Sequence, residues 1–221
     1  KRPDGKLVPP DVFIPLAEQN GSILAIGEWV LEEACRQLAE WRSQGLTWLR
    51  VAVNLSTAQL HHPELPTRVE QLLSRYALPA ETLELEVTET GLMEDIQAAA
   101  ENLHSLRRSG ALISIDDFGT GYSSLSYLKS LPLDKIKIDK SFVQDIHCDE
   151  GGATIVRAVI QLGKSLGMKV IAEGVETAEQ EAYLIGEGCH EGQGYYYSKP
   201  ITPQELTPLL QRTATLGALT T

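Results

Sequence analysis

The stretch Ala-Leu-Ile-Ser-Ile-Asp-Asp, residues 111–117, shows most clearly how this chain is expected to fold. Its first five residues are apolar or small and include β-branched side chains, which predicts a short buried strand. Two adjacent carboxylates, Asp116 and Asp117, then stand at the carboxyl end of that strand. Five other runs share this design, each with a polar residue at or near its carboxyl end: Trp48–Val53, Leu83–Val87, Lys135–Ile138, Met168–Ala172 and Cys189–Tyr197.

Segments with a helical spacing of apolar residues lie between the predicted strands, at Glu64–Tyr76, Glu94–Ser109, Ser123–Lys129, Ala153–Leu166 and Ala178–Ile185. Regular alternation of strand and helix indicates parallel βαβ units, in either an open doubly wound sheet or a closed (β/α)8 barrel. An open sheet gathers ligands at one switch point, whereas every strand end of a barrel points into a single mouth. Polar residues at all six strand ends therefore favour the barrel. These residues are Asn54, Glu86, the pair Asp116 and Asp117, Asp139, Glu173 and Gln193.

The segments that flank this repeat are helical by pattern. An amphipathic stretch, Ser22–Gln44, precedes the first predicted strand, and a shorter helix is expected from Pro10 to about Asn20. Gln204–Gln211 is a further helix candidate near the other end. The chain opens with a polar turn and no initiator Met, so we expect an excised domain whose first strands lie outside it. We assign residues 1–212 to this domain and 213–221 to a tail.

The composition narrows the class of protein. A formal net charge of −11 over 221 residues argues against non-specific binding of nucleic acid, which needs a basic surface. A phosphate-bearing substrate is compatible with this charge if bound cations offset the carboxylates. No apolar run is long enough to span a bilayer. Three cysteines without a CxxC pair fit a reducing, cytoplasmic compartment.

Each strand-end residue taken alone has a structural explanation. A single Asn54 or Asp139 after a strand is more often a helix cap or turn former than a ligand. The set is different, because adjacent carboxylates such as Asp116 and Asp117 repel one another unless cations or a lysine offset them. All the candidate ligands are oxygen donors, which select Mg²⁺ or Mn²⁺ over Zn²⁺ or copper.

Two such ions held close together can clamp an in-line phosphoryl displacement and activate water. Lys137 lies two residues before Asp139 and therefore on the same face of its strand. It is expected to serve as a point charge for a phosphate oxygen or the attacking water, or as an ion-pair partner of Asp116 or Asp139. The stretch Asp117–Ser124, with two glycines, suits a mobile loop over the mouth. A phosphate cradle is disfavoured there, because no P-loop lysine follows the second glycine.

Several longer motifs resemble those of the EAL domain family over essentially the whole chain. The matching motifs are Val-Asn-Leu-Ser at 53–56, Leu-Glu-Val-Thr-Glu at 85–89, Asp-Asp-Phe-Gly-Thr-Gly-Tyr-Ser-Ser at 116–124, Lys-Ile-Asp at 137–139, Ala-Glu-Gly-Val-Glu at 172–176 and Gln-Gly-Tyr at 193–195. The resemblance implies a modified (β/α)8 barrel with one antiparallel strand. It also implies metal-dependent hydrolysis of the bacterial messenger cyclic di-GMP to linear pGpG.

The resemblance also implies a role for each matching residue. Asn54, Glu86 and Asp116 resemble ligands of a first metal, and Asp116 bridges to a second metal that Asp117 helps to hold. Asp139 resembles a further metal or water ligand, and Gln193 a residue of the metal and water network. Lys137 resembles the group that orients the nucleophilic water, and Glu173 the general base and a metal ligand. Glu89 and Glu176 resemble supports of the 117–124 loop, and Lys137, Gly194 and Tyr195 resemble substrate-binding residues.

One part of the family pattern is absent, since the Glu-Ala-Leu signature itself does not occur in the chain. In the family its Glu is a metal ligand and a nearby Arg contacts substrate phosphate, so we expect the 221 residues alone to bind metal poorly. A degenerate EAL domain that binds cyclic di-GMP as a receptor is the alternative function. The family further implies a homodimer and regulatory sensor or GGDEF-type domains in a longer, cytoplasmic or inner-membrane-anchored protein. Neither nucleic acid polymer nor membrane is an expected partner of this domain.

Overall fold

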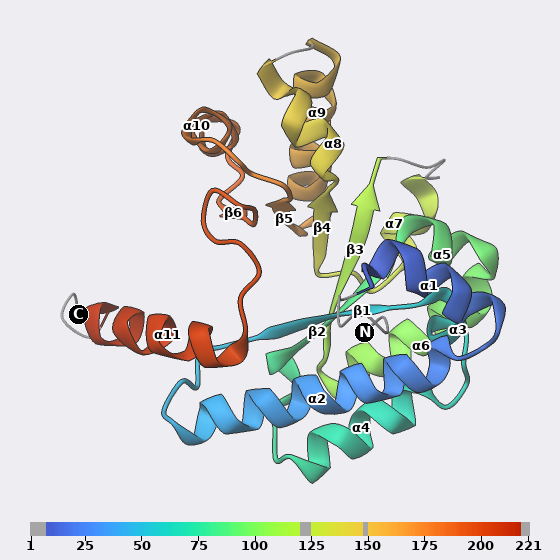
Figure 1. Ribbon diagram of the computed structural model, residues 1–221. Coiled ribbons are helices and arrows are strands. Elements are labelled where there is room, and N and C mark those ends of the chain that lie inside the picture. Colours follow the sequence, from blue (N-terminus) through green and yellow to red (C-terminus); the bar gives the residue numbers. More distant parts are fainter. Residues whose placement is uncertain (1–7, 120–124, 148–149, 218–221) are drawn as a thin grey trace.

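Six parallel strands form one curved sheet with helices along its outer face (Figure 1). The computed structural model describes residues 8–119, 125–147 and 150–217. Neighbours in the sheet follow chain order, so each strand pairs with the next one along the sequence. The strands are β1 (Val51–Leu55), β2 (Leu83–Thr88), β3 (Leu112–Phe118), β4 (Lys135–Ile138), β5 (Lys169–Ala172) and β6 (Glu191–Gly192).

Helices connect the strands and complete the βαβ pattern of a modified α/β barrel. Before β1 stand α1 (Pro10–Gln19) and α2 (Ile23–Ser43), and after it α3 (Thr57–Leu60) and α4 (Leu65–Arg75). The following helices are α5 (Glu89–Glu94), α6 (Ile96–Ser109), α7 (Leu125–Ser130) and α8 (Lys140–Gln144). The last three are α9 (Glu150–Leu166), α10 (Ala178–Glu187) and α11 (Pro203–Gly217), with short 3-10 turns at Ala80–Thr82 and Asp145–His147. None of the described helices is long and apolar enough to cross a bilayer.

Alternation along the strands separates an apolar outer layer from a polar inner face. In β2, Leu83, Leu85 and Val87 are buried in the main hydrophobic core, while Glu84 and Glu86 occupy the intervening positions. Successive strand residues point to opposite faces, so these two carboxylates share the inner face. Because the alternation is kept in the strands that follow, the inner face becomes a place for charged side chains.

Helix caps fix the points at which several strands end. Ser56 forms a capping box with Gln59 at the start of α3, directly after β1. Thr88, the last residue of β2, accepts a hydrogen bond from the Gly91 backbone at the start of α5. Asp139 caps α8 immediately after β4. These caps satisfy backbone N–H groups of the first helical turn and hold each strand end at a defined position.

The last helix returns to the beginning of the chain. Trp41 Nε1 on α2 donates to Thr207 Oγ1 on α11 at 2.8 Å, and Gln211 donates to Gln44 at 3.2 Å. Figure 1 shows α11 in red lying beside the carboxyl end of α2. The last helix therefore packs against the helix that precedes the first strand.

The barrel-like fold and the strand–helix order are confirmed, and several boundaries differ from expectation. The first strand begins at Val51 rather than Trp48, and β3 continues to Phe118, so Asp116 and Asp117 belong to the strand. The last strand is only Glu191–Gly192, and Gln193 therefore follows it. The helix α5 was not expected, because its six residues are too few to show the apolar spacing that predicts a helix. The helix α11 extends past the predicted end at Gln211, and the division at residue 212 stays a prediction.

Candidate active site

A single buried lysine organises the inner face at the carboxyl ends of the strands. The Lys137 side chain is 3% exposed, and its Nζ lies 2.6 Å from Glu86 Oε2, 3.0 Å from Asp116 Oδ1 and 2.6 Å from Glu173 Oε1. The four residues come from β4, β2, β3 and the segment after β5. One ammonium group therefore binds carboxylates from three other elements, and the ion pair predicted with Asp116 is present.

Strand register brings these side chains near one another, although the ion pair of Glu86 is offset by two positions: Glu86 is level with Lys135 but binds Lys137. Glu86 pairs with Ser114 of β3, and Ser114 pairs in turn with Lys135 of β4. Ser114 is fully buried and small, so the long side chains of β2 and β4 can meet across it. Its Oγ has no hydrogen-bond partner among the described residues. A larger residue at 114 would occupy the space that the ion pairs use.

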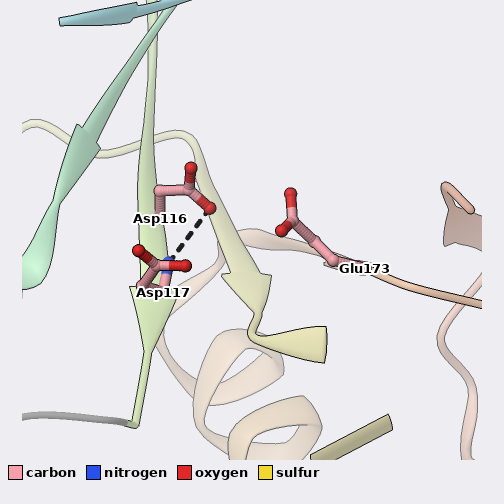
Figure 2. A group of neighbouring side chains, drawn as sticks. All are labelled: Asp116, Asp117 and Glu173. Carbon is pink, nitrogen blue, oxygen red and sulfur yellow. Dashed lines mark hydrogen bonds between the residues drawn. The ribbon is translucent and has the colours of Figure 1, made fainter. Parts of the chain in front are cut away.

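An acidic cluster lies beside the lysine. Among the described residues, Asp116, Asp117 and Glu173 each present one carboxylate oxygen, and these oxygens lie within 4.8 Å of one another. Figure 2 shows Glu173 pointing toward the two aspartates at the end of β3. The Asp117 backbone N–H donates to Asp116 Oδ1 at 3.0 Å, and Asp117 has a left-handed φ of 54°. That conformation costs energy for a residue other than glycine. Here it lets the carboxyl groups of the adjacent residues Asp116 and Asp117 lie in the same cluster.

Burial and ion pairing set the protonation of this group. Burial raises the pKa of Glu86 and of Glu173, and the hydrogen bonds from Lys137 only partly oppose it. For Asp117, burial and the neighbouring charges of Asp116 and Asp139 raise the pKa. Burial alone would lower the pKa of Lys137, but hydrogen bonds to Glu173 and Glu86 outweigh it and raise the pKa. The lysine is thus held in its charged form among carboxyl groups that favour a compensating cation.

The remaining predicted ligands lie around this cluster with different exposures. Asn54 is exposed on β1, directly in register with Glu86 of β2. Gln193 Nε2 donates to Glu173 Oε1 at 2.8 Å. Asp139 Oδ1 accepts from the Ser141 backbone at 3.0 Å, so the structural role of this residue as a helix cap is present. Burial would raise the pKa of Asp139, but these Ser141 hydrogen bonds keep it low.

The two predicted loop supports make different contacts. Glu89 is 2% exposed, and its Oε2 accepts from the backbone N–H of Gly119 at 3.1 Å. Gly119 is the last described residue of the predicted 117–124 loop. Its Oε1 is buried without a hydrogen-bond partner among the described residues. Glu176 accepts from Gln144 of α8 at 3.2 Å. The rest of the predicted loop, residues 120–124, lies outside the described residues.

A cavity of about 580 Å³ adjoins the cluster through Glu173 and Gln193. Gly194 and Tyr195, the predicted substrate contacts, also line it, and Lys199 Nζ lies 5.9 Å from the centroid of the Tyr195 ring. A cavity with carboxylates at one end and an exposed aromatic ring and a cation at another suits a ligand with phosphate and planar groups.

The donor chemistry of the site fits a hard divalent cation. The clustered ligand atoms are carboxylate oxygens, and no histidine or cysteine joins this group among the described residues. Oxygen-only donors with uncompensated negative charge are the set that Mg²⁺ and Mn²⁺ prefer.

The sequence predicted every residue of this cluster, but it did not predict the neighbouring ion pairs of Lys135 with Glu84 and Glu191. Glu84 and Lys135 each precede a predicted site residue, Glu86 and Lys137, by two positions. This spacing places them on the same face of their strands and could have predicted the second pair of charges.

Fold and site together define a barrel-like α/β protein with an acidic, lysine-centred site at its strand ends. The family model for the EAL domain matches residues 1–200. The bifunctional diguanylate cyclase/cyclic di-GMP phosphodiesterase MucR of Pseudomonas aeruginosa is 45% identical over 93% of this chain and 30% of its own length. The cyclic di-GMP phosphodiesterase PdeR of Escherichia coli is 41% identical over 90% of this chain and 30% of its own.

A solved structure is equally similar. The P. aeruginosa MucR phosphodiesterase in complex with c-di-GMP has a TM-score of 0.90 and 45% identity, and the match covers 93% of this chain and 83% of that one. The chain therefore belongs to the EAL domain family. It spans less than a third of the length of the two curated relatives described above.

Proposed function

We propose that this EAL domain hydrolyses cyclic di-GMP to linear pGpG with two divalent ions, Mg²⁺ or Mn²⁺. The observation that carries the proposal is the buried Lys137 bound to Glu86, Asp116 and Glu173 beside the Asp116–Asp117–Glu173 cluster. Metal-assisted hydrolysis of a phosphodiester needs oxygen ligands held in one place and is helped by a fixed positive charge, and this arrangement offers both. The names of the relatives MucR and PdeR support the choice of substrate.

The positions of several oxygen atoms support these ligand roles. Asn54, Glu86 and Asp116 would hold a first ion, since Asn54 and Glu86 are register partners and Asp116 shares Lys137 with Glu86. Asp116 would also face a second ion together with Asp117, with Asp139, Glu173 and Gln193 completing the ligand and water network. The bound ions would neutralise phosphate charge and make water more acidic.

The chain's own residues would then handle the proton and the substrate. Water attacks a phosphorus atom of the cyclic dinucleotide, its proton passes to Glu173, and the bond from phosphorus to the 3′ oxygen breaks. The departing 3′ oxygen takes a proton from solvent, which leaves a 3′ hydroxyl and a 5′ phosphate. Burial raises the pKa of Glu173 and makes it a stronger base than an exposed glutamate.

Lys137 and the adjoining cavity would position the reactants. The raised pKa of Lys137 keeps its ammonium charged, so it can orient the attacking water while it restrains Glu173. Gly194 and Tyr195 would contact the substrate from the cavity wall. Glu89 and Glu176 would support the loop that follows β3. We further propose a cytoplasmic homodimer regulated by sensor or GGDEF-type domains.

The test uses the full-length protein, cyclic di-GMP and either metal. We expect pGpG on chromatography with Mg²⁺ or Mn²⁺, no product with EDTA, and loss of most activity in Glu173→Gln. An exposed glutamine substitution, Glu101→Gln on α6, serves as the control and should keep wild-type activity. Binding of cyclic di-GMP without product under either metal would contradict the enzyme and would favour a receptor.

A further inference from the structure

A second layer of charges lies beneath the site on the same inner face. Lys135 Nζ is 3.0 Å from Glu84 Oε2 and 3.1 Å from Glu191 Oε2, and Lys169 Nζ is 2.9 Å from Glu191 Oε1. We call Glu84, Lys135, Lys169 and Glu191 the basal ion-pair layer. These four residues belong to β2, β4, β5 and β6.

Three residues of the basal layer lie near site residues along the chain, on the N-terminal side. Glu84, Lys135 and Glu191 each precede a site residue by two positions: Glu86, Lys137 and Gln193 respectively. Side chains two apart on a strand share a face, so Glu84 and Lys135 are stacked below Glu86 and Lys137. Gln193 follows the end of β6, and its backbone N–H donates to the Ala172 carbonyl of β5 at 2.9 Å, which keeps it beside the sheet. A movement of one strand along its axis would therefore displace a basal residue and a site residue together.

The contact between Lys135 and Glu84 is the most buried ion pair of this layer. The side chains of Lys135 and Glu84 are 14% and 7% exposed, whereas those of Glu191 and Lys169 are 36% and 64% exposed. A buried ion pair is weak evidence of stability, since packed apolar residues of similar volume are often as stable or more so. A directional ion pair does what an apolar contact does not, because it fixes which residue lies opposite which.

We infer that Lys135 is a positioning residue, which sets the axial alignment of β2, β4 and β6 and thereby the distances among Glu86, Lys137 and Gln193. The inference rests on the proposed function, because those residues matter as metal, water and base groups. Lys135 reaches β2 on one side and β6 on the other, and so spans the strands on which the site depends. It does not touch the reacting atoms.

The affinity for Mn²⁺ distinguishes a positioning role of Lys135 from a simple effect of its charge. Removing a positive charge next to an acidic site should tighten cation binding if charge alone matters. Loss of alignment should weaken it instead. We therefore expect Lys135→Met in the full-length protein to raise the Mn²⁺ dissociation constant, measured by calorimetry, roughly tenfold, with Lys135→Arg restoring part of the loss.

Two further variants control for lost stability and for failure of Lys135→Met to fold. Ile136→Val removes one methylene from the buried outer face of the same strand, so it should lower the melting temperature without changing Mn²⁺ affinity. Glu84→Gln combined with Lys135→Met removes both charges and avoids an unpaired buried carboxylate if the single variant does not fold. It should still bind Mn²⁺ more weakly than wild type.

Unchanged or tighter Mn²⁺ binding in Lys135→Met, or in the double variant where the single one does not fold, would overturn the inference. The readout does not depend on turnover. If wild-type protein binds Mn²⁺ but yields no pGpG, the proposed reaction fails, and the affinity comparison still decides the role of Lys135.

Discussion

Lys137 Nζ lies 2.6 Å from Glu173 Oε1, so the buried cation of β4 holds the carboxylate that is the candidate general base. The same nitrogen also binds Glu86 and Asp116. Base and ligands are consequently joined through one group, and a change at any of them is expected to affect the others. Effects of substitutions within such a network should not be additive.

Replacing Lys137 is expected to affect both activity and stability. In Lys137→Met three carboxylates lose their cation, which typically costs about 3–5 kcal/mol when a buried pair is broken. The turnover rate should fall at least ~100-fold, since a positioned charge at the reacting group is lost. Mn²⁺ should recover much of the melting temperature but not the rate. Turnover within threefold of wild type would contradict the role of Lys137.

Asp117→Asn is expected to remove one of two bound ions while leaving the other. The residue faces Asp116 and Glu173 within the acidic cluster but does not bind Lys137 in any of the ion pairs described above. Calorimetric titration with Mn²⁺ should show two sites in wild type and one in the variant. Glu101→Gln, an exposed change of equal charge, should keep two sites. Two sites of unchanged affinity in both variants would show that the Asp117 carboxylate is not needed to hold the second ion.

Gly119→Ala tests how the first turn after Asp117 is held. Gly119 has a φ of 100°, and an added Cβ would lie 3.0 Å from Phe142 Cε2 on α8. The strained backbone and the close contact should together cost about 1–3 kcal/mol and lower turnover. Gly186→Ala in α10 is the control, because a Cβ there meets nothing within 4 Å. It should be neutral or stabilise by about 0.5–1 kcal/mol. Equal effects of the two substitutions would exclude a special role for Gly119.

Glu191 gives the basal layer a defined response to pH. Burial would raise the pKa of Glu191, but hydrogen bonds from Lys169 and Lys135 outweigh it and lower the pKa. A lowered folded-state pKa stabilises the protein above the unfolded value of about 4.3, and this contribution is lost as pH falls through the folded value. Urea unfolding should therefore separate wild type from Glu191→Gln at about pH 7 and bring them together well below pH 4. A difference that grows on acidification would be inconsistent with this pKa shift.

The sequence predicted the parallel strand–helix order and the site residues because strand ends and motifs are local features. Lys135–Ile138 was predicted with its observed bounds, since alternating lysine and isoleucine has one clear period. The shortening of β6 to Glu191–Gly192 could not be predicted, because the aromatic residues that follow read as strand formers.

The basal layer was missed for a different reason. The Lys135 and Glu191 contact joins β4 to β6 across β5, so it links two strands that are not neighbours in the sheet. The exposure of large aromatic side chains could not be predicted from residue type either, since Trp29 and Trp48 are 65% and 54% exposed. Trp29 and Trp41 both lie on the amphipathic helix α2, and only Trp41 is buried, so an aromatic side chain does not by itself specify the buried face.

The most direct measurement is the fate of solvent oxygen during turnover of cyclic di-GMP by the full-length protein with Mn²⁺. In heavy-oxygen water, mass spectrometry should find one labelled oxygen in the 5′ phosphate of pGpG, and Glu173→Gln should yield almost no product. Unlabelled pGpG, or no pGpG from wild type that binds both Mn²⁺ and cyclic di-GMP, would contradict hydrolysis at this site.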